Sequence, residues 1–112
     1  MPTITPVALT SVTDATFADE VLASHKPVLV DFTAAWCPGC RMMAPILAQV
    51  ALEYEASLRV VTLDVDHNPE IQAAYGVLAI PALILFRDGE PVKSLVGARS
   101  KHRLLNELAD VI

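Results

Sequence analysis

The sequence predicts an α/β protein in which a central mixed sheet of five strands is flanked by four helices. Short runs of branched apolar residues alternate with stretches in which apolar residues recur every three or four positions, which indicates alternating strands and helices. Near the end of the chain, the pair Asp88-Gly89 is typical of the turn in an antiparallel hairpin. A length of 112 residues fits one domain, which we expect to span residues 1–112.

The composition excludes several classes of protein. Hydrophobic residues make up 54% of the chain and charged residues 19%, which excludes intrinsic disorder and a long coiled coil. Eight basic against thirteen acidic residues give a net charge of −5, so we expect neither nucleic acid nor a membrane as a partner. No apolar run reaches the roughly 18 residues of a membrane-spanning helix, and no secretion signal is visible. We therefore expect a cytoplasmic protein that is a monomer.

The first elements are a weak strand and a helix. We expect a loosely ordered lead-in over residues 1–11, with a short strand around Val7 to Leu9. A helix follows, for which Asp14 and Thr16 are candidate N-caps. It ends at Lys26-Pro27, because the residue before a proline avoids helical geometry.

The middle of the chain predicts two strands, each followed by a helix. The run Val28 to Phe32 indicates a buried strand, and residues 38–55 show the apolar spacing of a helix. A second strand is expected from Leu58 to Asp64. A short helix follows up to Tyr75-Gly76, with Asn68 as its expected N-cap.

The C-terminal third predicts a hairpin and a last helix. The buried run Ala82 to Phe86 is followed by the turn at Asp88-Gly89 and a return strand from Pro91 to Val96, which we expect at the edge of the sheet. Ser100 is the expected N-cap of the last helix. Its apolar stripe predicts packing against the sheet and consists of Leu104, Leu105, Leu108 and Ile112.

The chemistry of the chain is concentrated in its only two cysteines, Cys37 and Cys40. They follow a predicted strand and open a predicted helix, a position at which a Cys-x-x-Cys pair indicates redox activity. The spacing brings both sulfurs to one face of the first helical turn, while the unpaired N–H groups there stabilise a thiolate and lower the thiol pKa. We expect Cys37, nearer the exposed helix end, to be the attacking thiolate and Cys40 to be the buried resolving thiol.

The cysteine pair has two other interpretations. A zinc site needs four ligands, and His25, His67 and His102 have no ligand spacing to one another, so no metal is expected. A purely structural disulfide would close a loop of only four residues, which gains little chain entropy. Redox exchange is the better interpretation of both residues.

The chain resembles the thioredoxin family over nearly its whole length, from about Val12 onwards. The matching residues occur in the family's order and at its spacing, around a variant Cys-Pro-Gly-Cys sequence. They are Val30-Asp31-Phe32, Ala35-Trp36-Cys37, Cys40, Pro45, Asp66, Asn68-Pro69, Tyr75-Gly76-Val77, Ile80-Pro81, Asp88-Gly89 and Val96-Gly97. The resemblance implies the thioredoxin fold and a dithiol that reduces protein disulfides without a bound cofactor.

The resemblance also implies catalytic roles. It makes Cys37 the nucleophile and Cys40 the residue that resolves the mixed disulfide. Asp31 matches the family's buried acid, whose pKa burial would raise and which would accept the proton of Cys40. The alternative for Asp31 is a strand residue that points to solvent.

A docking surface is implied around Trp36, Pro38, Ile80 and Pro81. Pro81 matches the family's cis-proline beside the disulfide, and the backbone of Ile80 would pair with an extended substrate segment. Trp36 is expected to shield the reactive cysteine, with core packing as the alternative. Gly97 is expected to border this surface.

The chain departs from the family at four of the positions near the site. Pro38-Gly39 inverts the usual Gly-Pro between the cysteines, which frees an N–H at Gly39 for the thiolate and predicts a reduction potential a few tens of millivolts above the usual value. Thr33 stands where the family often has tryptophan. Thr62 stands where a lysine is common, so Asp31 lacks that cation and would hold its proton more tightly.

The leading hypothesis is a general disulfide reductase that is recharged by an NADPH-dependent thioredoxin reductase and acts on disulfide-containing substrate proteins. The inverted Pro38-Gly39 pair motivates a second hypothesis, a redox partner dedicated to one substrate. A third is a non-catalytic binding module on the same fold. Replacing Cys37 by serine separates the redox functions from the third, because a binding module needs no thiol.

Overall fold

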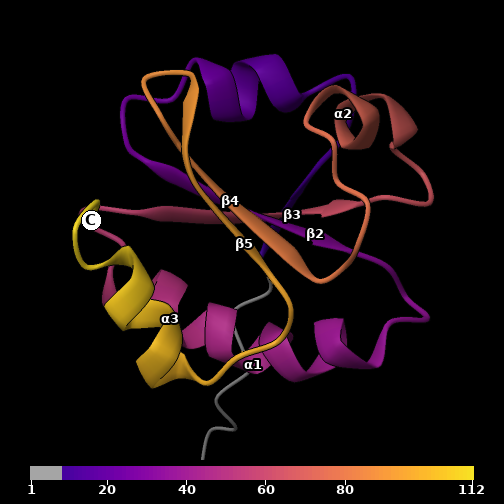
Figure 1. Cartoon of the computed structure of the whole chain (residues 1–112). Coiled ribbons are helices and arrows are strands. Elements are labelled where there is room, and N and C mark those ends of the chain that lie inside the picture. The colour runs from indigo at the N-terminus through magenta and orange to yellow at the C-terminus, as the bar shows by residue number, and fades with distance from the viewer. Residues whose placement is uncertain (1–8) are drawn as a thin grey trace, which may run out of the picture.

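The computed structural model describes residues 9–112 as a three-layer arrangement in which one sheet lies between two pairs of helices (Figure 1). The strand order is β1-β3-β2-β4-β5. β1 and β2 pair in parallel with β3, whereas β4 pairs antiparallel with both β2 and β5. The predicted mixed sheet of five strands is confirmed, with β5 at one edge as expected. The strands are β1 (Thr10–Val12), β2 (Val28–Thr33), β3 (Arg59–Asp64), β4 (Ala82–Arg87) and β5 (Glu90–Val96).

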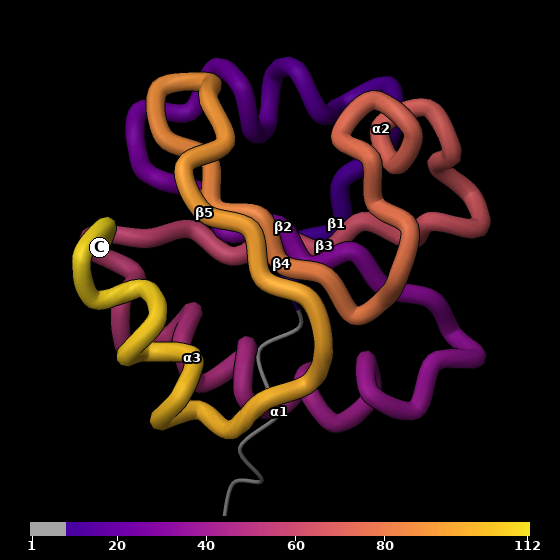
Figure 2. The backbone as a smooth tube through the Cα atoms, viewed as in Figure 1, coloured from indigo at the N-terminus to yellow at the C-terminus, as the bar shows by residue number. Residues whose placement is uncertain are grey.

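The four helical segments divide evenly between the two faces of the sheet, as the tube in Figure 2 makes plain. The long helix α1 (Pro38–Glu53) and the C-terminal α3 (Lys101–Leu108) cover one face. On the other face lie α2 (Pro69–Ala74) and a short π-helical segment, η1 (Ala18–Leu22). The order of strands and helices along the chain is therefore the predicted one.

Each face of the sheet has its own apolar core. Alternate residues of a strand point to opposite faces, so β2 contributes Val30 and Phe32 to the layer under η1 and α2, and Leu29 to the layer under α1 and α3. In the first layer, Phe17 and Tyr75 pack their rings against Phe86 at centroid distances of 5.4 and 5.1 Å. β2 is thus buried on both sides and forms a rigid base for the loop that follows it.

The two tight turns that the sequence predicts after β2, at Gly76 and at Asp88-Gly89, are present, and both use glycine with a positive φ. Asp88 and Gly89 have φ angles of 52° and 80°, the left-handed geometry of a two-residue hairpin turn. Gly76 closes α2 with a φ of 65°. Ser100 caps α3 as predicted, because its hydroxyl accepts a hydrogen bond from the backbone N–H of Arg103 at 3.1 Å.

The N-terminal expectations need correction. The strand expected around Val7 to Leu9 falls partly outside the described residues, and Leu9 is not in a strand; β1 comprises Thr10–Val12 and pairs with Val61 to Leu63. Thr10 and Ser11 therefore do not belong to the expected loose lead-in over residues 1–11. The strand lies later in the chain than expected, because Val12, which pairs with Leu63 of β3, is the residue of β1 whose side chain is buried.

Neither Asp14 nor Asn68 caps the helix that was expected of it. The carboxylate of Asp14 accepts hydrogen bonds from the N–H groups of Glu70 and Ile71 at 3.1 and 2.9 Å, so it caps α2 and not its own helix. The side chain of Asn68 does not cap α2. Its Oδ1 accepts from the N–H of Asp14 at 2.9 Å, and its Nδ2 donates to the carbonyl of Asp64. Contacts between distant segments override the local capping pattern here.

Within the described residues, no helix is both long and apolar enough to cross a membrane.

Candidate active site at the start of helix α1

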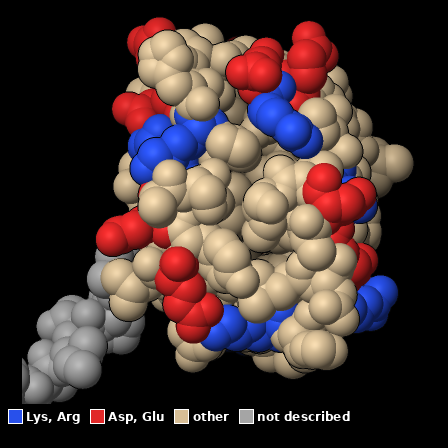
Figure 3. Space-filling model, turned by 90° about the vertical axis from the view of Figure 1, so that its left-hand side faces the viewer, with Lys and Arg blue, Asp and Glu red and all other residues tan. Residues whose placement is uncertain are grey.

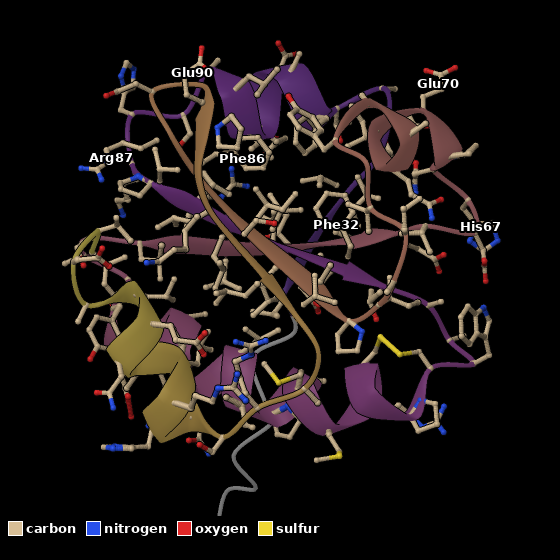
Figure 4. All side chains as sticks on the ribbon, viewed as in Figure 1. Phe32, His67, Glu70, Phe86, Arg87 and Glu90 are labelled. Atoms are coloured by element: carbon tan, nitrogen blue, oxygen red, sulfur yellow. A yellow bond between two sulfur atoms is a disulfide. The ribbon has the colours of Figure 1, made fainter. Side chains whose placement is uncertain are left out.

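The two cysteines form a disulfide at the point where the chain leaves β2 and enters α1. Their Cα atoms are 5.2 Å apart. Cys37 is the N-cap of α1, and its Sγ accepts a hydrogen bond from the backbone N–H of Cys40 at 3.2 Å. Pro38 occupies the first helical position, where its missing N–H has no partner to lose. In Figure 4 the disulfide is the yellow bond between two sulfurs at the beginning of α1, far from Arg87 and Glu90 at the other end of the sheet.

The expected difference in burial between the two cysteines is not present. Cys37 and Cys40 are each only 3% exposed. Both belong to the apolar core that also contains Val30 and Phe32. The prediction that Cys37 lies at the exposed helix end was wrong for the disulfide form, because the apolar core packs around both cysteines. The donor to this sulfur is also the N–H of Cys40, whereas the sequence pointed to that of Gly39.

Asp31 is buried within β2, as expected. It lies opposite Thr62 on β3 and Leu83 on β4, and by strand alternation it shares a face with Leu29, the face that α1 covers. Its Oδ1 has no hydrogen-bond partner among the described residues. Burial raises the pKa of this carboxyl from 3.8 to about 7. The alternative of a solvent-facing strand residue is excluded.

Trp36 is 63% exposed, which excludes core packing as its role. Its Nε1 donates a hydrogen bond to Oδ2 of Asp66 at 2.8 Å, which joins the loop before α1 to the loop after β3. The guanidinium of Arg41 donates to the carbonyl of Ala35 at 2.9 Å and fixes the same loop from the helix side. The indole is therefore held at the surface beside Cys37.

Pro81 has the expected cis peptide bond, preceded by Ile80. The carbonyl of Pro81 accepts a hydrogen bond from the N–H of Gly97 at 2.8 Å, so the turn after β5 is joined directly to the proline. Gly97 has a φ of 98°, which side-chain-bearing residues rarely adopt. Gly39 also lies close to Pro81, because a Cβ on Gly39 would stand 3.1 Å from Cδ of the proline. The expected site residues that therefore lie together at the redox motif are Gly39, Ile80, Pro81 and Gly97.

A hollow of about 360 Å³ lies beside this cluster and is lined in part by Trp36, Asp66 and Ile80. Leu78 also lines it and is 97% exposed, which is unusual for a large apolar side chain. The sequence reasoning missed Leu78. Its position two residues before Ile80, in a loop without a helical or strand pattern, was the available signal.

A second hollow, of about 290 Å³, is lined in part by Cys40 and Thr33. Its remaining walls include the small side chains of Ala34, Ala35 and Ala44. Thr33 stands where the family often has tryptophan, and the small residues there leave space unfilled. In the part of the chain that the structure describes, no group of three or more His, Cys, Asp or Glu residues is placed to hold a metal ion.

The structure combines a mixed sheet with a disulfide at the N-terminus of the helix that follows a central strand. It also has a cis-proline and a buried acid. This combination defines a thiol–disulfide oxidoreductase. The Cys37–Cys40 pair is its redox centre.

Comparison with known proteins gives the family. The model of the thioredoxin family matches residues 8–110. The chain is 55% identical over 105 residues to a thioredoxin from Mycobacterium bovis, covering 94% of this chain and 90% of the other. It is 48% identical over 105 residues to a thioredoxin from Alicyclobacillus acidocaldarius, covering 94% and 99%. It is also 52% identical over 101 residues to the bifunctional thioredoxin reductase/thioredoxin of Mycobacterium leprae, covering 90% and 22%. The chain belongs to the thioredoxin family.

Proposed function

We propose that Cys37 is the nucleophile of the reduction. In the dithiol form, its thiolate attacks one sulfur of a substrate disulfide, forms a mixed disulfide and releases the other substrate sulfur as a thiolate. The place of Cys37 as the N-cap of α1 supports this role, because the N–H of Cys40 points at its sulfur and the helix dipole favours negative charge there. This arrangement is the observation that carries the proposal.

The second step uses Cys40 and Asp31. The Cys40 thiol gives its proton to the Asp31 carboxylate, and the resulting thiolate attacks the Cys37 sulfur of the mixed disulfide. The second substrate sulfur leaves as a thiolate, so the substrate gains two electrons and the Cys37–Cys40 disulfide forms. A carboxyl whose pKa is raised to about 7 is suited to accept and return a proton near neutral pH.

Substrate docks on the exposed surface around the disulfide, which we define as Trp36, Pro38, Leu78, Ile80 and Gly97. The backbone of Ile80 pairs with an extended segment of the substrate. Ile80 supports this role because no backbone hydrogen bond within the described residues engages it. Pro81 lies against the redox motif, because Gly39 leaves room for its ring.

We further propose that one domain, residues 1–112, works as a monomeric carrier in the cytoplasm and is recharged by an NADPH-dependent thioredoxin reductase. The fusion named in the Mycobacterium leprae relative supports such a partner. Nucleic acid is not a partner in this proposal. On the face in Figure 3, basic side chains are interspersed with acidic ones, and the net charge of the chain is −5.

Two cysteine variants test the proposed mechanism with insulin as the disulfide substrate. Cys37→Ser is expected to abolish reduction. Cys40→Ser is expected to attack insulin once and to remain attached, which mass spectrometry detects as a covalent adduct that dithiothreitol releases. If Cys37→Ser still reduces insulin, or if the adduct forms through Cys37→Ser and not through Cys40→Ser, the assignment of nucleophile and resolving thiol is overturned.

A further inference from the structure

Arg99 is a buried cation that none of the steps above uses. Its side chain is only 3% exposed. It follows the turn after β5 and precedes α3, and in Figure 1 this segment passes across α1 on its way to α3. The backbone N–H of Arg99 lies 3.4 Å from Sδ of Met43 in α1, which confirms the close approach. A charge buried to this extent destabilises a fold unless it is paired and hydrogen-bonded.

All three nitrogens of the Arg99 guanidinium donate hydrogen bonds. Its Nη1 lies 2.6 Å from both carboxylate oxygens of Glu107 in α3. Its Nε donates to the carbonyl of Gly97 at 3.1 Å, and its Nη2 donates to the carbonyl of Val96 at 2.5 Å. The hydrogen bond from Arg99 is the main reason that the pKa of Glu107 lies below its usual value. Arg99 therefore ties α3 to two consecutive carbonyls of the turn after β5.

These two carbonyls belong to the turn that borders the disulfide. The C=O and N–H groups of a trans peptide point in opposite directions, so a carbonyl held from one side fixes the next N–H on the other. Arg99 holds the Val96 carbonyl, and the N–H of Gly97 donates to the carbonyl of Pro81 at 2.8 Å. Arg99 likewise holds the Gly97 carbonyl, which turns the N–H of Ala98 away from the guanidinium.

The N–H of Ala98 is left without a partner. No hydrogen-bond acceptor for it exists among the described residues. Ala98 lies beside the redox motif, since its Cβ is 3.6 Å from the position of a Cβ on Gly39. An oriented and unpaired N–H at this place is suited to a carbonyl of an extended peptide segment.

We propose that Arg99 is a positioning residue for substrate docking, which holds the Val96–Gly97 turn so that the Ala98 N–H and Pro81 face the incoming chain. This inference rests on the proposed function, because it concerns how protein substrates bind at the same disulfide. The partner is an extended segment next to the substrate's disulfide, and it contributes a backbone carbonyl to the Ala98 N–H. A small disulfide without a peptide backbone makes no such contact.

The main test is Arg99→Met, which keeps an apolar stem and removes the guanidinium. We expect KM for insulin to rise about fivefold, the scale of one lost hydrogen bond, with kcat unchanged. The rate with 5,5′-dithiobis(2-nitrobenzoate), which has no peptide backbone, is expected to stay the same. The reduction potential is also expected to stay the same, because Arg99 has no hydrogen bond to the sulfur of Cys37 or Cys40.

Arg103→Met is the matched control. Arg103 is exposed and lies 3.3 Å from the same Glu107 carboxylate, but it has no hydrogen bond to the turn after β5. It is expected to leave KM for insulin unchanged. Arg99→Lys keeps the positive charge but lacks the planar, forked guanidinium. It replaces Arg99→Met in the test if that variant does not fold. A smaller rise in KM for insulin is expected from it.

The outcomes separate this inference from the proposed function. If the unaltered protein reduces neither insulin nor the small disulfide, the proposed function fails. If the unaltered protein is active and both Arg99 variants fold with unchanged KM for insulin, or lose activity equally with both substrates, Arg99 is only a structural residue and the inference is overturned.

Discussion

Gly39 faces Pro81 so closely that a Cβ on the glycine would lie 3.1 Å from Cδ of the proline ring. Such a distance is shorter than a normal carbon–carbon contact, which is about 3.5–4.0 Å. The inverted order of Pro38 and Gly39 therefore places the smaller residue against the cis-proline and the ring at the first helical position. The redox motif and the docking proline fit together through the absence of a side chain at Gly39.

Gly39→Ala is expected to disturb this fit. Alanine in place of glycine within a helix ordinarily stabilises a protein by about 0.5–1 kcal/mol. Here we expect most of that gain to be lost, because Pro81 must move, and we expect kcat/KM for insulin to fall severalfold. Urea unfolding and insulin reduction measure the two effects. If Gly39→Ala gains the full stabilisation expected of alanine in a helix and keeps kcat/KM unchanged, Pro81 moves aside without an effect on activity and the prediction is wrong.

Exchanging Pro38 and Gly39 (P38G together with G39P) restores the family's usual order. The exchange moves an N–H from position 39, the second residue of α1, to position 38, the first. Only the N–H groups of the second and third helical residues reach an N-cap side chain, so the Cys37 thiolate keeps fewer donors within reach and the dithiol becomes a stronger reductant. We expect the reduction potential to fall by a few tens of millivolts, toward about −270 mV. Equilibration with glutathione or dithiothreitol at pH 7 measures it for both proteins. Equal potentials would contradict a role for the inversion.

Asp31 makes the stability of the oxidised protein depend on pH. Its pKa is raised from 3.8 to about 7 by burial, so between these values the folded protein binds more protons than the unfolded chain. The free energy of unfolding therefore falls as pH rises through this window, by up to about 4 kcal/mol. Asp31→Asn lacks the titrating group. It is expected to equal the unaltered protein at pH 4 and to exceed it at pH 8.

The control for this prediction is Asp19→Asn, since Asp19 is exposed on η1. It is expected to keep the pH dependence of the unaltered protein. Denaturant unfolding at a series of pH values provides the comparison. If the free energy of unfolding of Asp31→Asn changes with pH as steeply as that of Asp19→Asn, the Asp31 carboxyl does not cause the pH dependence of stability.

Asp31→Asn is also expected to slow the release of substrate from the mixed disulfide, because Cys40 loses its proton acceptor.

Leu78 is expected to contribute to docking without contributing to the core. Leu78→Ser removes an almost fully exposed apolar side chain at the hollow beside Trp36, so the free energy of unfolding is expected to stay within about 0.5 kcal/mol. KM for insulin is expected to rise, and reduction of the small disulfide to remain unchanged. Leu52→Ser, an exposed leucine near the C-terminal end of α1, is the matched control. Equal KM values for the two variants would remove Leu78 from the docking surface.

The sequence predicted the order of strands and helices along the chain well, because that order depends on local patterns. Branched apolar runs identify β2 and β4, and a single acid inside such a run identified Asp31 as buried. The cysteine spacing and the Asp88-Gly89 turn are equally local. In each of these cases, a few neighbouring residues determine the structure.

The parts that the sequence did not predict depend on contacts between distant segments. Asp14 caps α2 across a separation of more than fifty residues, and the pattern around Asp14 gave no sign of it. Arg99 resembles a surface residue in sequence, and only the meeting of β5, α1 and α3 buries it. Cys37 is buried because the apolar core packs around it, which helix position alone does not reveal.

The edge strand β5 has a further consequence for a protein whose proposed partners present extended segments. Pro91 in β5 has no N–H to offer to a neighbouring strand, and Lys93 adds a charge that pairs with Asp110 at 3.3 Å. A second copy of the chain therefore finds a poor template along β5. An extended substrate segment can therefore dock at the disulfide while β5 itself remains unsuited to pair with another strand.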